Sequence, residues 1–309
     1  MSTPGRDTAP ILLFAYKRLE TLQNTVNALA KNELAPESDL FIFSDSGRRE
    51  EDKPAVRAVR EYLQTVKGFR SVRIEEAIKN RGLANSIITG VTDIINSHGR
   101  VIVLEDDILT TPNFLTFMNT ALDKYEQQPR VFSVSGYSFN LGQPDERAYP
   151  WDTYFTTRGW SWGWATWKDR WTGIDWQVSD YAQFAGNAAE RRRFAEGGSD
   201  LNLMLKRQMT GQLDSWAIRW FYHQYKVQGL SLYPILSKVY NDGFDALATH
   251  TRGSNQRYRP LLDETHSLNF RMPDTAAITD MYQRRFQKKL GIRARILSKY
   301  QTLIGNLLK

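Results

Sequence analysis

The chain has 309 residues, of which 41% are hydrophobic, and this is enough to bury the core of one large domain. It contains no cysteine, so disulfides, thiolate metal sites and a cysteine nucleophile are excluded, and a reducing cytoplasm is the expected compartment. The net charge of +7 arises at the end of the chain, because residues 284–309 contain eight Lys or Arg and no Asp or Glu. The remainder is nearly neutral, which disfavours nucleic acid as a partner.

No segment has the roughly 20 consecutive apolar residues that a membrane-spanning helix needs. The N-terminal run ILLFAY, residues 11–16, is too short for the apolar region of a signal peptide and better fits a buried strand. We therefore expect a soluble cytoplasmic protein, or one held at a membrane surface.

Apolar runs alternate with segments of helical spacing through the first 130 residues. Strands are predicted at 10–16, 71–78 and 100–107, and residues 39–47 are predicted to form a strand that ends in a loop. Helices are predicted at 19–32, 52–66, 80–99 and 112–129. This alternation predicts a Rossmann-like α/β fold, with a mostly parallel central sheet flanked by helices.

The second half of the chain has a different composition. A strand is predicted at 131–139, and seven of the nine tryptophans lie within residues 151–176. A helix is predicted at 214–229 and a strand that leads into a loop at 230–251. Residues 251–275 are expected to form an exposed polar loop, because they contain few apolar residues.

Polar residues follow each of the first four predicted strands. Arg18, Asp45 and Asn80 follow the first three, and the fourth strand runs directly into the carboxylates of Glu105–Asp107. Ligands of open α/β sheets bind in the crevice outside the carboxyl ends of the strands. We therefore expect these side chains to line one crevice.

The three adjacent carboxylates need a positive partner, because unpaired charges in a cleft are costly. A divalent cation such as Mn²⁺ or Mg²⁺ would supply it, since hard cations take oxygen ligands and reach a substrate phosphate through one or two carboxylates. The alternative is structural, with Asp106 or Asp107 capping the helix that comes next. The residues alone leave both interpretations open.

Five motifs, taken together, resemble those of GT-A glycosyltransferases in order and spacing. The motifs are ILLFAYKR (11–18), FIFSDSGRREEDKPAV (41–56), KNRGLANSI (79–87), LEDD (104–107) and LDSWAIRW (213–220). LEDD is similar to the Glu-Asp-Asp form of the DxD motif. Over residues 8–255 the chain most resembles the N-acetylglucosaminyltransferase I group. Because it lacks the membrane-anchoring N-terminus of the eukaryotic enzymes, it looks like a bacterial relative.

The resemblance implies a GT-A fold in which residues 8–130 bind the nucleotide and residues 131–255 form the acceptor and catalytic half. It implies metal-dependent, inverting transfer of a sugar from a nucleotide-diphospho sugar, with a UDP-sugar favoured, to a hydroxyl of a glycan or lipid-linked glycan. Asp107 would hold the metal. The other implied contacts are Arg18 with the nucleotide, Asp45 with the uracil, Asn80 with the nucleotide sugar, and Glu105 and Asp106 with the donor sugar and ribose.

The attacking hydroxyl must lose its proton to a base, and Asp214 is the candidate. It lies in the segment that resembles the family's Trp-Asp-Asp-Trp motif, which carries the base. Its neighbours Leu213 and Trp216 predict an apolar setting, which would raise the pKa of the carboxyl. The alternative is that Asp214 caps the predicted helix 214–229.

The tryptophan-rich segment suggests a role in binding sugars, because the flat faces of aromatic rings can stack against sugar rings. Relatives carry a Gly-Trp-rich segment that lines the donor-sugar and acceptor site. Flanking glycines make Trp160 and Trp162 the candidates for ligand contact, and the other tryptophans are expected in the core. Trp160, Trp162 and Trp164 alternate as on one face of a strand, whereas Trp164, Trp167 and Trp171 are at helical spacing.

A loop near residue 250 is expected to close over the donor, as it does in the relatives. His250 is a candidate for binding either the metal or the diphosphate, and the alternative is an ordinary surface histidine. Asn241–Gly243 are expected to belong to the same loop, because glycine permits a turn there.

Residues 256–309 form a C-terminal extension that ends in a basic amphipathic helix. The apolar stripe comprises Phe286, Leu290, Leu297, Tyr300, Ile304 and Leu307. Such a helix would bind an anionic membrane surface, placing the protein at the inner face of the plasma membrane near lipid-linked acceptors. The alternative is a helix that packs on the body, with its charges solvated.

Two other classes of function stay open. A nucleotidyltransferase would share the sheet and the acidic metal residues, but it usually has a Gly-rich basic loop after the first strand, and AYKRLETLQ (15–23) contains no glycine. A non-catalytic carbohydrate-binding protein would use the tryptophans. It would not need three carboxylates at the end of a strand.

Overall fold

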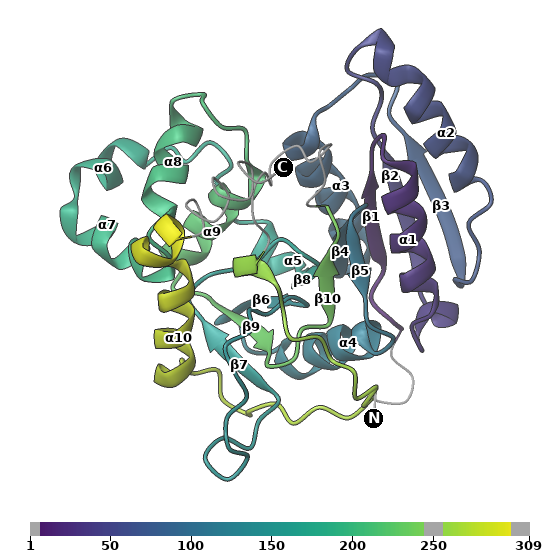
Figure 1. The fold of residues 1–309 in the computed structure, drawn as a ribbon. Coiled ribbons are helices and arrows are strands. Elements are labelled where there is room, and N and C mark those ends of the chain that lie inside the picture. The colour runs from purple at the N-terminus through teal and green to yellow at the C-terminus, as the bar shows by residue number, and fades with distance from the viewer. Residues whose placement is uncertain (1–6, 244–255, 298–309) are drawn as a thin grey trace.

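A computed structural model describes residues 7–243 and 256–297 of the chain. An eight-stranded sheet has the order β3-β2-β1-β4-β8-β6-β9-β7, and β5 and β10 form a separate two-stranded sheet (Figure 1). The strands are β1 (Ile11–Ala15), β2 (Asp39–Ser44), β3 (Ser71–Glu76), β4 (Arg100–Glu105), β5 (Ile108–Thr110), β6 (Val131–Ser135), β7 (Thr153–Thr156), β8 (Trp164–Trp167), β9 (Leu230–Pro234) and β10 (Val239–Asn241).

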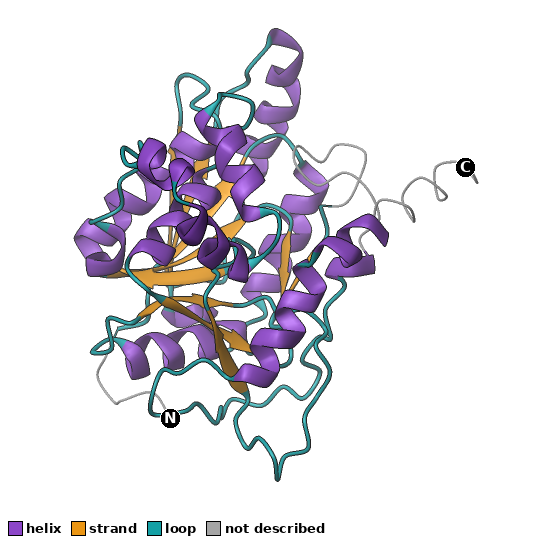
Figure 2. Ribbon diagram, turned by 90° about the vertical axis from the view of Figure 1, so that its left-hand side faces the viewer, coloured by secondary structure: helices purple, strands orange, loops and turns teal. Residues whose placement is uncertain are grey.

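Helices lie on both sides of the strands, as the view in Figure 2 shows. They are α1 (Leu19–Ala30), α2 (Lys53–Leu63), α3 (Leu83–His98), α4 (Phe114–Tyr125), α5 (Lys168–Trp171), α6 (Tyr181–Gly186), α7 (Ala188–Phe194), α8 (Leu201–Met209), α9 (Trp216–Lys226) and α10 (Asp280–Leu290). The predicted α/β fold with a mostly parallel sheet flanked by helices is confirmed.

The first half of the chain builds the parallel part of the sheet. The strands β3, β2, β1 and β4 pair in parallel, with Ile11 opposite Leu40 on one side and opposite Ile102 on the other. In the second half, β8 runs antiparallel between β4 and β6, β9 is parallel to β6, and β7 is antiparallel to β9 at the edge. The carboxyl ends of the first four strands therefore meet at one edge of the sheet.

The side chains of β1 alternate between the two faces of the sheet, so this strand contributes to the core on both faces. Side chains of a strand point alternately to the two faces of a sheet. Leu12 and Phe14 pack in a cluster with residues of α3 and α9. Ile11, Leu13 and Ala15 pack in the other cluster, with residues of α1, α2 and α4. All five are buried, which is the reason that this strand has an unbroken apolar sequence.

Of the two spacings in the tryptophan-rich segment, the alternation of a strand holds at Trp164, and the helical spacing is wrong for Trp164 and Trp167. Both lie in β8, where Trp164 pairs with Ser135 of β6 and Trp167 with Arg100 of β4. Residues three apart in a strand face opposite sides, and the two rings pack in different core clusters. Pairing with strands on both sides decided the structure here, and the local spacing of apolar residues did not.

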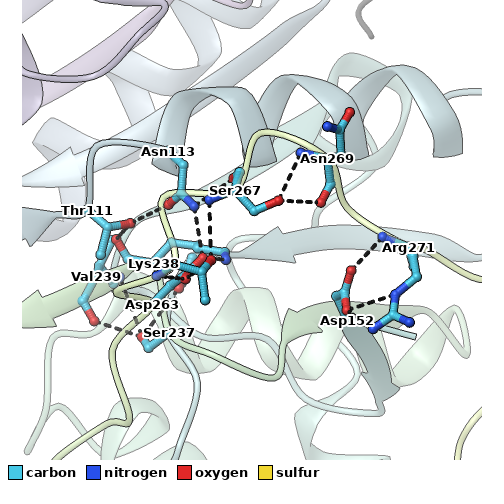
Figure 3. Close-up of polar contacts among 12 residues, drawn as sticks. Thr111, Asn113, Asp152, Ser237, Lys238, Val239, Asp263, Ser267, Asn269 and Arg271 are labelled. Atoms are coloured by element: carbon cyan, nitrogen blue, oxygen red, sulfur yellow. Dashed lines mark hydrogen bonds and ion pairs between the residues drawn. The ribbon is translucent and has the colours of Figure 1, made fainter. Parts of the chain in front are cut away.

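Residues 251–275 were expected to form an exposed polar loop, and this is wrong for part of the stretch that the structure describes. We call residues 256–279 the strap. Asp263 is only 3% exposed and forms a buried ion pair with Lys238 (Figure 3). Asn113 Nδ2 donates to Asp263 and to the carbonyl of Ser267, both at 2.8 Å, and Arg271 pairs with Asp152 at 3.0 Å. Buried polar partners, which the local sequence does not reveal, hold this segment against the body.

The predicted C-terminal helix is divided into two parts. In α10, which lies beside β7 in Figure 1, the side chains of Tyr282, Phe286 and Leu290 are buried. The backbone is extended at Gly291, with a ψ of 164°, so the helix ends there. Phe286 and Leu290 therefore belong to the core, and the expectation that they share one exposed stripe with Leu297 is wrong. The rest of that stripe lies outside the described residues.

Residues 292–297 are helical again, and their apolar side chains are open to solvent. Ile292 is 65% exposed and Ile296 is 62% exposed. Within residues 7–243 and 256–297, no helix is long and apolar enough to cross a membrane.

Candidate active site

A cavity of about 480 Å³ lies at the carboxyl ends of β1, β2 and β4. Its lining includes the predicted site residues that the structure describes: Arg18, Asp45, Asn80, Glu105, Asp106, Asp107, Trp160, Trp162 and Asp214. The first six come from the parallel half of the sheet and the last three from the second half. The predicted crevice therefore exists, and both halves of the chain form it. His250 lies outside the described residues.

Arg18 is the positive partner of the acidic triplet in this structure. Its Nη2 atom pairs with a carboxylate oxygen of Asp106 and, at 2.8 Å, with Oδ2 of Asp107. The three side chains are mostly buried, with 18%, 7% and 14% exposed for Arg18, Asp106 and Asp107. Arg18 lies just after β1 and the triplet lies at the end of β4, and these two strands are hydrogen-bonded neighbours. Sheet pairing thus brings the charges together.

One arginine does not neutralise three carboxylates. Burial, reinforced by the charges of Asp107 and Asp106, raises the pKa of Glu105 to about 8. Burial also raises the pKa of Asp106 to about 6, against the opposing effect of Arg18. A cation bound here would favour the ionised forms of these two carboxyls, because an opposite charge nearby lowers the pKa of a carboxyl.

The carboxylates are not helix caps, which removes the structural alternative. A short strand, β5, comes directly after the triplet, and α4 begins only at Phe114, with Asn113 in the position before it. Asp106 instead accepts a long hydrogen bond of 3.4 Å from the backbone N–H of Tyr16. Asp106 and Asp107 therefore belong to the cavity wall rather than to the end of a helix.

The β5–β10 pair encloses Asp107 from the other side. Asn241 pairs with Ile108, and the N–H of Asp242 donates to the backbone carbonyl of Asp107 at 2.9 Å. A Cβ atom on Gly243 would lie 2.0 Å from Oδ2 of Asp107. Glycine was expected here because it permits a turn, but the contact shows a different reason, which is the close approach of the backbone to a carboxylate.

Asp45 and Asn80 form the opposite end of the cavity. The carboxylate of Asp45 accepts hydrogen bonds from the N–H groups of Ser46, Arg81 and Gly82 and from Nδ2 of Asn80, at 2.8 to 3.0 Å. These contacts join the end of β2 to the segment that precedes α3. Both residues lie where the sequence placed them, at the ends of neighbouring parallel strands.

Asp214 does not have the apolar setting that its neighbours suggested. Its side chain is 69% exposed, and its Oδ1 atom lies 3.5 Å from a guanidinium nitrogen of Arg219. It is not the cap of α9 either, because Ser215 caps that helix through a hydrogen bond from the N–H of Ile218. Both sequence interpretations of its environment are therefore wrong, since the carboxylate is exposed and the next residue is the cap. Asp214 still lines the cavity.

The two candidate tryptophans differ in how much surface they offer. Trp160 is 7% exposed and stacks on Tyr137, with ring centroids 5.2 Å apart. Trp162 is half-buried and meets Tyr137 edge-on at 4.7 Å. Trp164 belongs to the core at 1% exposed. Trp162 therefore presents more of its ring toward the cavity than Trp160 does.

Arg158 is a residue of the cavity wall that the sequence did not single out. Its guanidinium makes two hydrogen bonds to Asp200, at 2.9 and 3.0 Å, and lies 5.2 Å from the ring centroid of Trp160. Nothing in the local sequence TTRGW signals this role, because Asp200 lies 42 residues further along the chain. The pair keeps Trp160 in place at the wall.

The described part of the chain contains no group of three or more His, Cys, Asp or Glu side chains arranged to hold a metal. Mg²⁺ and Mn²⁺ do not require one, because such ions commonly bind through one or two carboxylates together with substrate phosphates. The hard oxygen ligands of the triplet fit such an ion.

The fold and the site define an α/β protein with an acidic ligand cavity at the carboxyl edge of its sheet. No protein-family model matches the sequence. No curated protein matches it either.

Three solved structures are similar to this chain. The mannosyltransferase PcManGT from Pyrobaculum calidifontis, in complex with GDP-Man and Mn²⁺, is 13% identical over 55% of this chain and 47% of its own, with a TM-score of 0.36. TarS from S. aureus is 11% identical over 47% of this chain and 24% of its own, with a TM-score of 0.32. The glycosyltransferase GlyE from Streptococcus pneumoniae TIGR4 is 12% identical over 72% and 45%, with a TM-score of 0.35.

The chain thus spans less than half the length of each of these proteins. Similarities with TM-scores below 0.5 are too weak to assign an activity, and nothing in them points to the N-acetylglucosaminyltransferase I group in particular. The geometry of the cavity is the stronger guide to function.

Proposed function

We propose that this protein is a metal-dependent glycosyltransferase that moves a sugar from a nucleotide-diphospho sugar to a hydroxyl group. The observation that carries the proposal is the position of the acidic triplet. Glu105–Asp107 lie in one cavity with polar residues from the ends of two neighbouring strands and with Trp162 and Asp214 from the second half of the chain. Such a cavity can hold the nucleoside, the diphosphate and the sugar of a nucleotide-diphospho sugar.

In this proposal Asp107 holds Mn²⁺ or Mg²⁺ together with oxygens of the donor diphosphate. The bound ion would act as a Lewis acid that stabilises the charge of the departing nucleotide diphosphate. Arg18 lies against the same carboxylates, so its guanidinium is placed to bind a phosphate oxygen. Its fixed position supplies positive charge without reorganisation.

Asp214 is the proposed base. Its side chain is 69% exposed, so the carboxylate can meet an acceptor hydroxyl that enters from solvent. A single base with direct displacement inverts the anomeric centre, and an inverting reaction is therefore proposed. A UDP-sugar is the proposed donor, and a glycan or lipid-linked glycan is the proposed acceptor.

An anionic membrane surface is a further proposed partner, which would place the protein at the cytoplasmic face of a membrane. Ile292 and Ile296 are exposed apolar residues on the short helix after Gly291, and basic residues surround them in the sequence. Exposed apolar and basic side chains on one helix favour binding to anionic lipid. Phe286 and Leu290 take no part, because they are buried.

Calorimetry tests the proposed reaction. UDP, GDP, CMP and dTDP are titrated with and without Mn²⁺ into the wild type, Asp107→Ala and the exposed control Glu33→Gln. One nucleotide is expected to bind the wild type and the control, and to bind at least about tenfold more weakly without metal or in Asp107→Ala. Release of the nucleotide diphosphate from the matching donor sugar then distinguishes transfer from simple binding.

Two results would contradict the proposal. If no nucleotide binds under any condition while a free glycan does, the protein is a carbohydrate-binding protein. If a nucleoside triphosphate and a sugar phosphate are joined with release of pyrophosphate, it is a nucleotidyltransferase.

A further inference from the structure

The carboxylate of Asp45 has no acceptor position left for a ligand. Its Oδ1 atom accepts from the N–H groups of Ser46 at 2.8 Å and Arg81 at 2.9 Å. Its Oδ2 atom accepts from the N–H of Gly82 and from Nδ2 of Asn80, both at 3.0 Å. An ionised carboxylate offers about four lone-pair positions. Donors of the chain itself occupy all of them, and three of the four come from the segment Asn80–Gly82.

The same contacts determine which way the amide of Asn80 faces. Its Nδ2 atom donates to Oδ2 of Asp45 and, at 2.7 Å, to the backbone carbonyl of Ser46. Both partners can only accept, so the amide cannot be reversed without loss of both hydrogen bonds. The Oδ1 atom of Asn80 accepts no hydrogen bond from the described residues, and Asn80 lines the cavity. This oxygen is available to a donor group on a ligand.

We propose that Asp45 is a positioning residue and that Oδ1 of Asn80 makes the ligand contact at this end of the cavity. The inference rests on the proposed function, in which the ligand here is the nucleoside of the donor. Asn80 then accepts from an N–H of the base or from a hydroxyl of the ribose. The resemblance to known glycosyltransferases had implied that Asp45 itself contacts the base. The hydrogen bonds of its carboxylate instead support a role in positioning residues 80–82.

Asp45 affects the shape of the cavity by holding residues 80–82 in place. Gly82, Leu83 and Ser86 at the start of α3 line the same cavity as Asn80. Gly82 has a φ of +74°, so the turn into α3 is one that other residues rarely adopt. The hydrogen bonds from the N–H groups of Arg81 and Gly82 to Asp45 stabilise this turn. Without them the ligand-facing side of residues 80–86 would lose its fixed position.

Calorimetric titration of UDP, GDP, CDP and dTDP in saturating Mn²⁺ tests the inference on the full chain. The variants are Asp45→Asn, Asn80→Ala, the double variant, and the control Asp93→Asn, which changes an exposed carboxylate on α3. Asp45→Asn is expected to weaken every nucleotide that binds by about the same factor, roughly tenfold, without changing their order. The double variant is expected to bind no more weakly than the weaker single variant, because Asp45 acts through Asn80.

Three UDP analogues identify the group that Asn80 accepts from. Asn80→Ala is expected to weaken UDP but not the analogue that lacks the relevant donor, which is 3-methyl-UDP for the base N–H, and 2′-deoxy-UDP or 3′-deoxy-UDP for a ribose hydroxyl. If Asn80→Ala weakens UDP and all three analogues equally, the proposed contact is wrong. If Asp45→Asn reorders the nucleotides, or if the effects of the two single variants add in full, Asp45 contacts the base itself and the inference is overturned.

Hydrogen exchange separates failure of this inference from failure of the proposed function. The amides of Arg81 and Gly82 are expected to exchange at least about tenfold faster in Asp45→Asn than in wild type or Asp93→Asn, because they lose a charged acceptor. This measurement needs no nucleotide. If the wild type binds none of the four, the proposed function fails while the exchange result still stands. Unchanged exchange in Asp45→Asn would overturn the positioning role.

Discussion

Gly243 shows how a single missing side chain shapes the acidic end of the cavity. A Cβ there would lie 2.0 Å from Oδ2 of Asp107 and 3.0 Å from a guanidinium nitrogen of Arg18. Real Cβ atoms do not approach so closely, so a side chain at this position would displace the carboxylate. The backbone can approach Asp107 only because residue 243 is glycine.

Gly243→Ala is therefore expected to lower metal-dependent nucleotide affinity by at least about tenfold, while the melting temperature changes by only a few degrees. Gly186→Ala is the matched control, because a Cβ there would have no atom within 4 Å. Calorimetry and thermal unfolding measure the two effects. Equal nucleotide affinity in Gly243→Ala and Gly186→Ala would show that the carboxylate of Asp107 does not need its present position.

The acidic triplet predicts a pH dependence of stability. The pKa of Glu105 rises from an ordinary value of 4.5 to about 8 in the folded protein, because of burial and the neighbouring carboxylates. Between these values the folded state binds a proton that the unfolded state has released, so stability decreases as pH rises. Without added metal, the melting temperature of the wild type is expected to fall between pH 5 and pH 8 more than that of Glu105→Gln. Identical slopes would contradict the raised pKa.

At the scale of the structural elements, a buried ion pair next to β10 stabilises the β5–β10 pair. Lys238, directly before β10, pairs with Asp263 of the strap, and their side chains are 6% and 2% exposed (Figure 3). The carbonyl of Lys238 accepts from the N–H of Thr111, which comes directly after β5. The strap thus supports the two strands that enclose Asp107.

Lys238→Met is expected to lower the free energy of unfolding by about 3–5 kcal/mol, because it leaves Asp263 buried without a counter-charge. The double variant Lys238→Met/Asp263→Leu is expected to recover much of this loss, since it removes both charges. Lys53→Met, at the exposed pair with Glu50, is the control and should have little effect. Denaturant unfolding measures all three. A double variant that is no more stable than the single one would contradict the proposed role of the ion pair.

At the scale of the whole molecule, the C-terminal region has two parts that differ in burial. Phe286 is fully buried and stacks edge-on with Phe139 and Tyr233, so it joins α10 to the same core as the first strand. Ile292 and Ile296 come only a few residues later and are open to solvent. One part therefore belongs to the core, and the other is exposed.

Phe286→Ala is expected to destabilise the protein by about 3–5 kcal/mol. Ile292→Asp/Ile296→Asp should leave stability nearly unchanged but abolish most flotation with anionic liposomes. Leu203→Asp, at another exposed apolar residue, is the control for a general effect of charge. If the double aspartate variant floats as well as the control, the membrane proposal fails.

Much of the fold was predictable because local patterns and tertiary contacts agree in the first half of the chain. Each of the four apolar runs before residue 108 forms a strand, and each segment of helical spacing forms a helix. Since parallel strands end at one edge of their sheet, the residues after them could also be predicted to meet. The second half was less predictable, because Trp164 and Trp167 are placed by the strands on either side of them.

The sequence alone determined that carboxylates, an arginine and an amide would gather at one edge of an α/β sheet, because strand ends and residue types can be read locally. Only the tertiary structure decided how they are used. Arg18 pairs with Asp106 and Asp107, and Asp45 accepts hydrogen bonds from the N–H groups of residues 81 and 82. Gly243, which follows β10, approaches Asp107. These relations join residues that are far apart in the chain, and hydrogen-bond capacity and steric contact become visible only once the chain is folded.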